Sequence, residues 1–386
     1  MNAAADKLWD IIIIGGGLGG LSLAVELSDP EFAHLSVLVL EKRTSYTRDR
    51  TWSYWTDQPH RYSHLERQRW QHWNVSMLGV QHSHSSAQVS YATLDADAFY
   101  QSAMQSIGNA GHIELRMGCA VTAVDTTDAT VTLQGAQVLR ARTVLDARPA
   151  ALHQPSALVQ QFVGWEVTTQ HDVFDAQSVQ LMAFEPHSRG LHFWYVLPYN
   201  ARCALVETTW VSPADWQPDY DAEMRNYLAK LCSGQNYSIA YQEQGVLQLD
   251  APAQQNTSPV GLGRNGGTLR AATGYAFLDT IGHAAQLAQS LASHLKSGTT
   301  TAWQAVPYQR PATDAWMDSV FLQVLAQDWQ AAPDYFMQIF KSLSAQDTVA
   351  FLTGRATCIQ KLAMMRALPV RPFASAALAR LWGHSA

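Results

Sequence analysis

Three glycines near the start of the chain have the spacing of a phosphate-binding turn. They are Gly15, Gly17 and Gly20, in the pattern G-x-G-x-x-G. In such a turn the first glycine allows a tight bend, the second lets the backbone approach a pyrophosphate, and the third lets the next helix pack closely on the strand. Free N–H groups and the positive dipole at the helix N-terminus then favour bound phosphate. These residues therefore predict a dinucleotide site.

Two predicted strands and a helix surround this turn. Residues 11–14 are four consecutive isoleucines, which is typical of a strand buried on both faces, and residues 18–27 are good helix formers with an apolar face. A second apolar run, 35–40, ends at Glu41, which follows Gly20 by 21 residues and could accept the hydroxyls of an adenosine ribose. The pattern predicts FAD or NAD rather than NADP, and its position at the N-terminus favours FAD. The alternative is a glycine-rich turn in another α/β fold.

A glutamate lies within an apolar segment in the middle of the chain. Residues 202–210 read RCALVETTW, so Glu207 has apolar and β-branched neighbours. In an alternating strand such a side chain commonly faces solvent. Alternatively it lines a hydrophobic cavity, where loss of hydration raises the pKa of the carboxyl and makes it a useful proton donor. The pattern alone leaves both interpretations open.

The composition limits the possible partners. Of the 386 residues 47% are hydrophobic and 15% are charged, and the net charge of −6 argues against nucleic acid. The four cysteines form no C-x-x-C pair, so we expect free thiols in a reducing compartment. We expect neither a secretory signal nor a transmembrane segment, because no apolar run is long enough. His82 and His84 have no carboxylate or thiol at usual ligand spacing, so we expect a solvated loop there and no metal site.

The segments after Glu41 should complete the cofactor domain. Residues 42–56 carry charges and hydroxyls, including Arg50 and Thr51, and are predicted to form a loop over the cofactor. Residues 93–109 predict a helix, because Thr93, Asp95 or Asp97 could cap its start and Gly108-Asn109 end it.

Alternating segments follow. Four short ones between 113 and 139 predict an antiparallel meander, and a buried strand over 143–145 should end at Asp146 and return to the nucleotide sheet. Four more strands between 162 and 211 predict an antiparallel sheet that is inserted into the cofactor domain and could wall a substrate pocket.

The last third of the chain returns to glycine and then to helices. A glycine-rich stretch ends near Gly274 and Tyr275, and the helix predicted over 280–295 could present its N-terminal N–H groups to a flavin or a pyrophosphate. Residues 302–386 read as helical, with apolar stripes that serve either packing or contact with a long apolar molecule or a bilayer.

Together these elements predict an α/β fold with a Rossmann-type FAD-binding domain of the flavin monooxygenase or glutathione reductase kind. An antiparallel β-sheet substrate domain is inserted into it, and a helical C-terminal region follows. The expected bounds are 1–80, 93–155 and 255–300 for the FAD-binding domain, 156–254 for the substrate domain and 301–386 for the helical region.

Several later blocks resemble the lycopene cyclase family, the FAD-dependent bacterial type that makes β-rings in carotenoids. The resemblance covers nearly the whole chain, in the right order. Its blocks are RTWSYW (50–55), QFVGWEV (161–167), LMAF (181–184), YVLP (195–198), LVETT (205–209), EQGVL (243–247), ATGYAF (272–277) and a C-terminal pattern through Phe373.

The resemblance implies a reaction and a set of site residues. A terminal alkene of a linear polyene such as lycopene is protonated, the cation is attacked by an internal double bond, and a proton is lost without net redox change. The family's essential glutamate corresponds to Glu207, reduced FAD is the cofactor, and NAD(P)H is the reductant to be expected. The residues expected to bind FAD are Gly15, Gly17, Gly20, Glu41, Arg50, Thr51, Asp146, Gly274 and Tyr275.

The resemblance also implies a location and leaves alternatives. A long apolar polyene lives in bilayers, so we expect a cytoplasmic protein, peripheral to the inner face of the cell membrane. Two residues depart from the family pattern. Ala183 stands where the family commonly has Asp, and Thr208 stands where it commonly has Asp or Tyr. These departures could change the substrate or the proton route. The alternatives are a flavin-dependent monooxygenase or other oxidoreductase on an apolar substrate, with Glu207 only structural, and a carotenoid-binding flavoprotein without activity.

Overall fold

A parallel sheet organises the N-terminal part of the chain. In the computed structural model, which describes residues 7–149, 158–249, 260–298 and 303–381, strand β1 (Leu8–Ile14) lies between β2 (Val37–Leu40) and β11 (Val138–Asp146). Strand β8 (Ile113–Arg116) extends the sheet beyond β2, also in parallel. The isoleucines of β1 are buried on both faces, as the sequence predicts, because alternate side chains enter two different cores.

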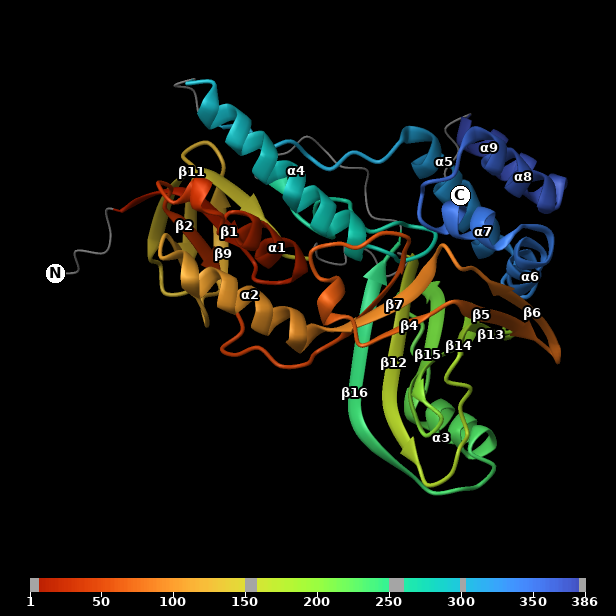
Figure 1. Ribbon diagram of the computed structural model, residues 1–386. Helices are drawn as coiled ribbons and strands as arrows, with labels where there is room; N and C mark the ends of the chain where they lie inside the picture. Colours follow the sequence, from red (N-terminus) through yellow and green to blue (C-terminus); the bar gives the residue numbers. More distant parts are fainter. Residues whose placement is uncertain (1–6, 150–157, 250–259, 299–302, 382–386) are drawn as a thin grey trace.

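Helices cover one face of this sheet. They are α1 (Leu18–Glu26), α2 (Ala96–Ala110) and α4 (Phe277–Lys296), and their apolar faces form one core with Ile11 and Ile13. The short helices η1 (Pro30–Phe32) and η2 (Ser63–Leu65) lie in the connections. Figure 1 shows α1, α2 and α4 grouped around the strands at the N-terminal side of the molecule.

The predicted meander over 113–139 is only partly correct. Strands β9 (Val121–Asp125) and β10 (Thr130–Leu133) are antiparallel, but β8 belongs to the parallel sheet, and one long strand, β11, replaces the two that the sequence suggested. The first half of β11 alternates between exposed and buried while its end is fully buried, so the pattern changes within a single strand. The two-residue strand β17 (Val260–Gly261) pairs with that buried end.

A second, larger sheet carries the middle of the chain, as predicted. Its strands are β12 (Leu158–Thr169), β13 (Ser178–Glu185), β14 (Leu191–Asn200), β15 (Cys203–Pro213) and β16 (Tyr237–Gln248), in the order β16-β12-β15-β14-β13, all antiparallel. Two strands from far upstream, β5 (His72–Met77) and β6 (Val80–Ser85), extend it beyond β13. His82 and His84 therefore lie in a strand rather than in the expected loop.

A small three-stranded sheet joins the two larger ones. Strand β3 (Thr51–Thr56) pairs with β7 (Ser90–Asp95), which also pairs with β4 (Gln68–Trp70). The predicted loop over 42–56 therefore becomes a strand from Thr51 onward, because β3 finds a partner about 40 residues later in the chain, which local sequence does not reveal.

Helices cover both faces of the large sheet. Helix α3 (Tyr220–Leu231) packs on one face, and the predicted helical C-terminal region packs on the other. This region contains α5 (Ala312–Gln327), α6 (Ala332–Ser342), α7 (Ala345–Leu352), α8 (Cys358–Ala367) and α9 (Val370–Leu381). In Figure 1 the five helices gather at the opposite end of the molecule from the parallel sheet.

These features confirm the predicted fold class. The expected domain boundaries near 155, 254 and 300 lie outside the described residues. Within the described part of the chain, no helix is both long and apolar enough to cross a bilayer.

Candidate active site

The glycine turn has the geometry of a backbone that approaches a ligand. Gly15 has φ +97°, and a Cβ there would lie 3.1 Å from the carbonyl carbon of Ala147, so only glycine fits without strain. A side chain at Gly20 would overlap the carbonyl oxygen of Gly15, because α1 lies directly against β1. A Cβ at Gly17 would meet nothing within 4 Å, and this residue lines a cavity.

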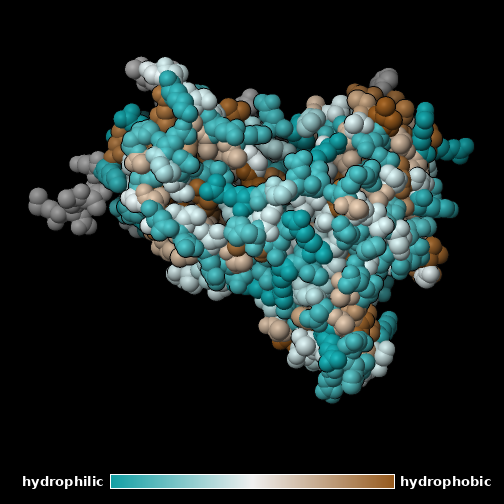
Figure 2. Space-filling model, in the orientation of Figure 1, coloured by the Kyte–Doolittle hydropathy of each residue, from teal (hydrophilic) through white to brown (hydrophobic). Residues whose placement is uncertain are grey.

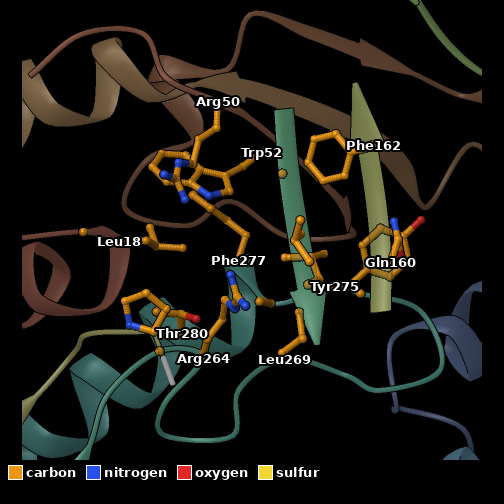
Figure 3. Close-up of a pocket in the computed structure, with 18 of the residues that line it drawn as sticks. Leu18, Arg50, Trp52, Gln160, Phe162, Arg264, Leu269, Tyr275, Phe277 and Thr280 are labelled. Atoms are coloured by element: carbon orange, nitrogen blue, oxygen red, sulfur yellow. The ribbon is translucent and has the colours of Figure 1, made fainter. Parts of the chain in front are cut away.

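This cavity is large and runs between the two sheets. It has a volume of about 840 Å³, and its lining extends from the glycine turn to the C-terminal helices α5, α6 and α7. Figure 3 shows Arg50 and Trp52 on one side of the cavity and Arg264, Leu269 and Thr280 on the opposite side. Gln160 and Phe162 line it from strand β12. Its lining is thus charged at one end and apolar at the other. The apolar end includes Leu181, Leu205, Leu322, Leu325 and Phe336.

The charged end suits a diphosphate. Helices α1 and α4 both begin at this cavity, and neither N-terminus is capped by a side chain, so their first N–H groups are available to an anion. Arg264 also lines the cavity, and it makes no ion pair with any described residue. Burial and the charge of Arg50 lower the pKa of Arg264, as expected where positive charge lacks an anionic partner. The residues present therefore fit the pyrophosphate of a dinucleotide.

The acidic residue after β2 is placed beside the same end. Glu41 is buried and lines the cavity, and its Oε2 accepts a 2.7 Å hydrogen bond from the Gly16 N–H. Burial acts to raise the pKa of Glu41, but hydrogen bonds and charge from Arg43 outweigh it and hold that pKa below its usual value. An ionised carboxylate here can accept ribose hydroxyls.

The remaining predicted cofactor residues divide into two groups. Arg50, Thr51, Gly274 and Tyr275 line the cavity. Asp146 does not, and its carboxylate accepts hydrogen bonds from the backbone N–H, Nε and Nη2 of Arg148, whose side chain does line the cavity. Asp146 therefore positions a residue of the site rather than facing the cavity itself.

Glu207 lies farther along the same cavity, on the large sheet. Alternation along β15 turns Leu205, Glu207 and Thr209 toward the cavity, and their neighbours toward α3. The side chain is not solvent-facing, since Glu207 is only 8% exposed. Of the two interpretations of this residue, the structure supports the carboxyl at the wall of a largely apolar cavity.

A second glutamate meets Glu207 beside the cavity, on the same face of the large sheet. Gly164 on β12 is the register partner of Glu207 on β15 and of Glu243 on β16, so the three residues form one row across the sheet. A Cβ at Gly164 would lie 2.8 Å from Cγ of Glu207 and 3.2 Å from Cγ of Glu243. The glycine leaves room for the two carboxyls to hydrogen bond with each other.

The surroundings decide which carboxyl holds the shared proton. Burial, and then the charge of Glu243, raise the pKa of Glu207 well above its usual value. Burial also raises the pKa of Glu243, which is 5% exposed, but hydrogen bonds from Glu207, Tyr241 and Thr51 oppose it. The Tyr241 hydroxyl and the Thr51 hydroxyl donate to Oε2 of Glu243 at 2.8 and 3.0 Å. The pKa of Glu243 is raised overall as well, so the pair shares a proton, and the two hydroxyl donors favour the negative charge on Glu243 and the proton on Glu207.

Tyrosine side chains complete the wall beside Glu207. Tyr195 is the register partner of Glu207 on β14, and its hydroxyl lies 2.8 Å from that of Tyr91, which accepts a hydrogen bond from Tyr275 at 3.4 Å. Burial raises the pKa of all three phenols, so they remain neutral. Neutral aromatic rings at an apolar wall can stabilise a nearby cation through their π faces.

The two departures from the family pattern lie away from this cavity. Thr208 points to the α3 side of the sheet, where its hydroxyl donates to Glu223 at 2.7 Å and lies 3.0 Å from Nε2 of His192. Ala183 packs against the core on that same side. Neither residue lines the cavity, so neither departure removes a carboxylate from it.

Sequence reasoning missed three residues of this site. Glu243 and Gly164 stand within motif blocks, but only strand pairing brings them to Glu207. Arg264 lies in a glycine-rich stretch without acidic residues, and this absence of an acidic partner could have indicated a cation that is available to bind phosphate. Among the described residues, no group of three or more His, Cys, Asp or Glu could hold a metal ion, and the ring of His84 is hydrogen bonded to the carbonyl of Phe340 at 2.8 Å.

Comparisons with known proteins agree with this architecture. A family model described as "Lycopene cyclase protein" matches residues 10–378. Comparison with curated protein sequences finds no match.

Solved structures of low sequence identity share the fold. A geranylgeranyl bacteriochlorophyll reductase-like protein from Thermoplasma acidophilum is 14% identical with a TM-score of 0.66, covering 98% of this chain and 100% of that one. The halogenase PltM in complex with phloroglucinol and FAD is 14% identical with a TM-score of 0.60, covering 97% and 96%. The Diels-Alderase PyrE3 is 14% identical with a TM-score of 0.61, covering 90% and 81%.

Proposed function

The chain belongs to the lycopene cyclase family, and from this premise we propose that it is a flavin-dependent, non-redox cyclase. Its substrate would be lycopene or a similar long polyene, whose linear end groups it converts to β-rings. The observation that carries the proposal is the buried carboxyl pair of Glu207 and Glu243, because a proton held at the wall of an apolar cavity is what protonation of an alkene requires.

Glu207 acts as the acid in this proposal. Its proton passes to a terminal alkene carbon, where a C–H bond forms and a tertiary cation remains on the polyene. An internal double bond attacks the cation and closes the ring, and loss of a proton from the ring restores a double bond. Atoms and electrons balance, so the product has the mass of the substrate. The proton lost from the ring returns to the Glu207 carboxylate, which regenerates the acid, because burial and the negative charge of Glu243 make this carboxylate a good proton acceptor.

The residues at the charged end of the cavity would hold FAD. The backbone of the glycine turn, the N-termini of α1 and α4 and the Arg264 guanidinium would bind the pyrophosphate, and Glu41 the adenosine ribose. When bound in its reduced form, FAD would supply negative charge to a dry pocket in which a cation develops. NAD(P)H is the reductant that we propose for it. The cavity has walls of Tyr195, Phe162 and Leu205 that exclude water from the reacting polyene.

The test is product analysis in cells that accumulate lycopene. Wild-type protein should yield ringed carotenoids of unchanged mass, whereas Glu207→Gln should leave lycopene. The matched control is Glu185→Gln, an exposed glutamate on β13, which should behave as wild type. Persistence of lycopene with folded, FAD-containing wild-type protein would contradict lycopene as the substrate.

A second measurement separates the cyclase from an oxidoreductase. With purified protein in D₂O, each new ring should incorporate about one deuterium from the exchanged Glu207 carboxyl, with no stoichiometric consumption of NAD(P)H or oxygen. A product heavier by oxygen, or one NAD(P)H consumed per product, would favour a flavin-dependent monooxygenase on an apolar substrate. Pigment that binds without change in its spectrum would favour a carotenoid-binding flavoprotein.

We also propose that the protein works in the cytoplasm at the inner face of the cell membrane, because a polyene of this kind dissolves in bilayers rather than in water.

A further inference from the structure

Helices α8 and α9 are apolar on two faces. Their inner faces join the protein core through Met364, Leu368 and Ala376. Their outer faces expose large apolar side chains at helical spacing: Ile359, Leu362 and Met365 on α8, and Val370, Leu378 and Leu381 on α9. Three of these are almost fully accessible, with Ile359 81%, Val370 75% and Leu381 70% exposed. We refer to these six side chains as the outer face.

This apolar surface is visible on the molecule. Figure 2 shows hydrophobic residues gathered at the upper right, where Figure 1 places α8 and α9. A contiguous exposed apolar patch on a protein commonly marks a protein or membrane contact.

The same segment is basic in an acidic protein. Residues 351–386 contain five Lys and Arg and no Asp or Glu, which gives this segment a net charge of +5. The whole chain has a net charge of −6, so residues 1–350 have a net charge of −11. Three of the five cations have partners: Arg355 pairs with Asp57, Lys361 with Asp314, and Arg380 donates to Gln323.

The other two cations indicate which kind of partner binds the outer face. Arg366 and Arg371 are exposed, adjoin the outer face and have no ion-pair partner among the described residues. Apolar side chains bordered by unpaired cations match the chemistry of an anionic lipid surface. A second copy of the chain fits less well, because two such faces would bring the same cations together.

The outer face also lies at the apolar end of the cavity. Helix α9 packs on α5 through Ala376, Val320 and Val324, while Leu322 and Leu325 of α5 line the cavity. The inner walls of the cavity and the outer face are therefore opposite sides of one group of helices.

We propose that the outer face of α8 and α9 is the surface by which the protein docks on an anionic bilayer. The proposal deepens the proposed function and rests on it, because it places the apolar end of the cavity at the lipid side of the molecule. The lipid contact can be measured independently of any reaction, so its failure and the failure of the cyclase proposal are distinguishable.

The test is flotation of the full-length FAD-loaded protein with vesicles of phosphatidylcholine alone or with phosphatidylglycerol. Wild type should bind the anionic vesicles more strongly. The double variant Arg366→Gln/Arg371→Gln should lower affinity for anionic vesicles about 25-fold, since each cation near the surface contributes about fivefold, and should leave binding to neutral vesicles unchanged. The double variant Ile359→Ser/Val370→Ser should weaken binding to both kinds.

The control variants change exposed residues elsewhere on the molecule. Leu8→Ser/Val138→Ser removes two exposed apolar side chains from the parallel sheet, and Arg142→Gln/Arg225→Gln removes two exposed cations. All four double variants should retain FAD absorbance and activity on substrate in detergent micelles, and both controls should float as wild type.

Three results would overturn the proposal. They are wild-type protein that binds no anionic vesicle, outer-face variants that float like the controls, and a wild-type dimer in light scattering that the outer-face variants convert to monomer. The last outcome would assign the face to a second copy of the chain.

Discussion

Replacement of Glu243 by Gln should move the pH dependence of cyclisation without removing the acid. Glu243 lies beside Glu207 on the same face of the sheet and does not line the cavity, so the variant leaves the lining of the cavity unchanged. The glutamine oxygen can still accept from Tyr241 and Thr51, and its amide can donate to Glu207. What the variant removes is one negative charge next to the proton donor.

The direction follows from the shared proton. Glu207 must be protonated to act, so activity is lost as pH rises through its pKa. An anionic neighbour disfavours ionisation of Glu207, so the loss of that neighbour lowers this pKa and the alkaline limb should begin at lower pH. Two unit charges about 4 Å apart repel by about 4 kcal/mol at an effective dielectric constant of about 20, equivalent to at most about three pH units.

The assay is kcat measured against pH with purified protein, reduced FAD and solubilised lycopene. We expect the alkaline limb of Glu243→Gln to lie about one to three units below that of wild type, with KM for the polyene unchanged. Titration of the flavin itself is common to both proteins, so the difference isolates Glu207. The control is Glu114→Gln, a surface glutamate on β8 paired with Arg116, which should leave the profile in place. An alkaline limb that does not move, or that moves upward, would refute the shared-proton assignment.

Three further predictions concern neighbouring parts of the site. Gly164→Ala should place a methyl group against both carboxyls and lower kcat about a hundredfold, with an unchanged circular dichroism spectrum and FAD content; wild-type kcat would contradict the role of this glycine. Glu207→Gln should stabilise the protein at alkaline pH: the folded-state pKa of Glu207 lies above its unfolded value, so the wild-type free energy of unfolding falls by up to about 1.4 kcal/mol per unit as pH rises between the two, and the variant lacks this loss. Urea unfolding from pH 4 to pH 9 tests it, and a variant advantage that is the same at every pH would disprove it. Arg264→Gln should weaken FAD binding about 10- to 100-fold in fluorescence titration, whereas the exposed control Arg142→Gln should not; equal affinities would remove Arg264 from the phosphate site.

Much of the fold could be predicted because it depends on local patterns. Four isoleucines before a glycine turn specify a buried strand and the start of α1, whatever the rest of the chain does. Helical spacing likewise predicts the C-terminal region, in which Ser344 and Thr357 cap α7 and α8. The predictions that failed concerned strands. Local alternation identifies β8 but does not say which sheet it joins, and the polar segments that form β6 and the start of β3 were expected to be loops because their strand partners are not visible in the local sequence.

The sequence by itself determined the residue types of the site: a glycine turn, a carboxylate after the second strand, and Glu207 in an apolar strand. Only the tertiary structure decided that Glu207 faces a cavity, that Thr208 does not, and that Glu243 shares its proton. The physical reason is that β12 lies between β15 and β16, and its Gly164 holds two carboxyls together from positions 36 residues apart in the chain. A pKa depends on burial and on nearby charges, and these are fixed only when distant segments pair.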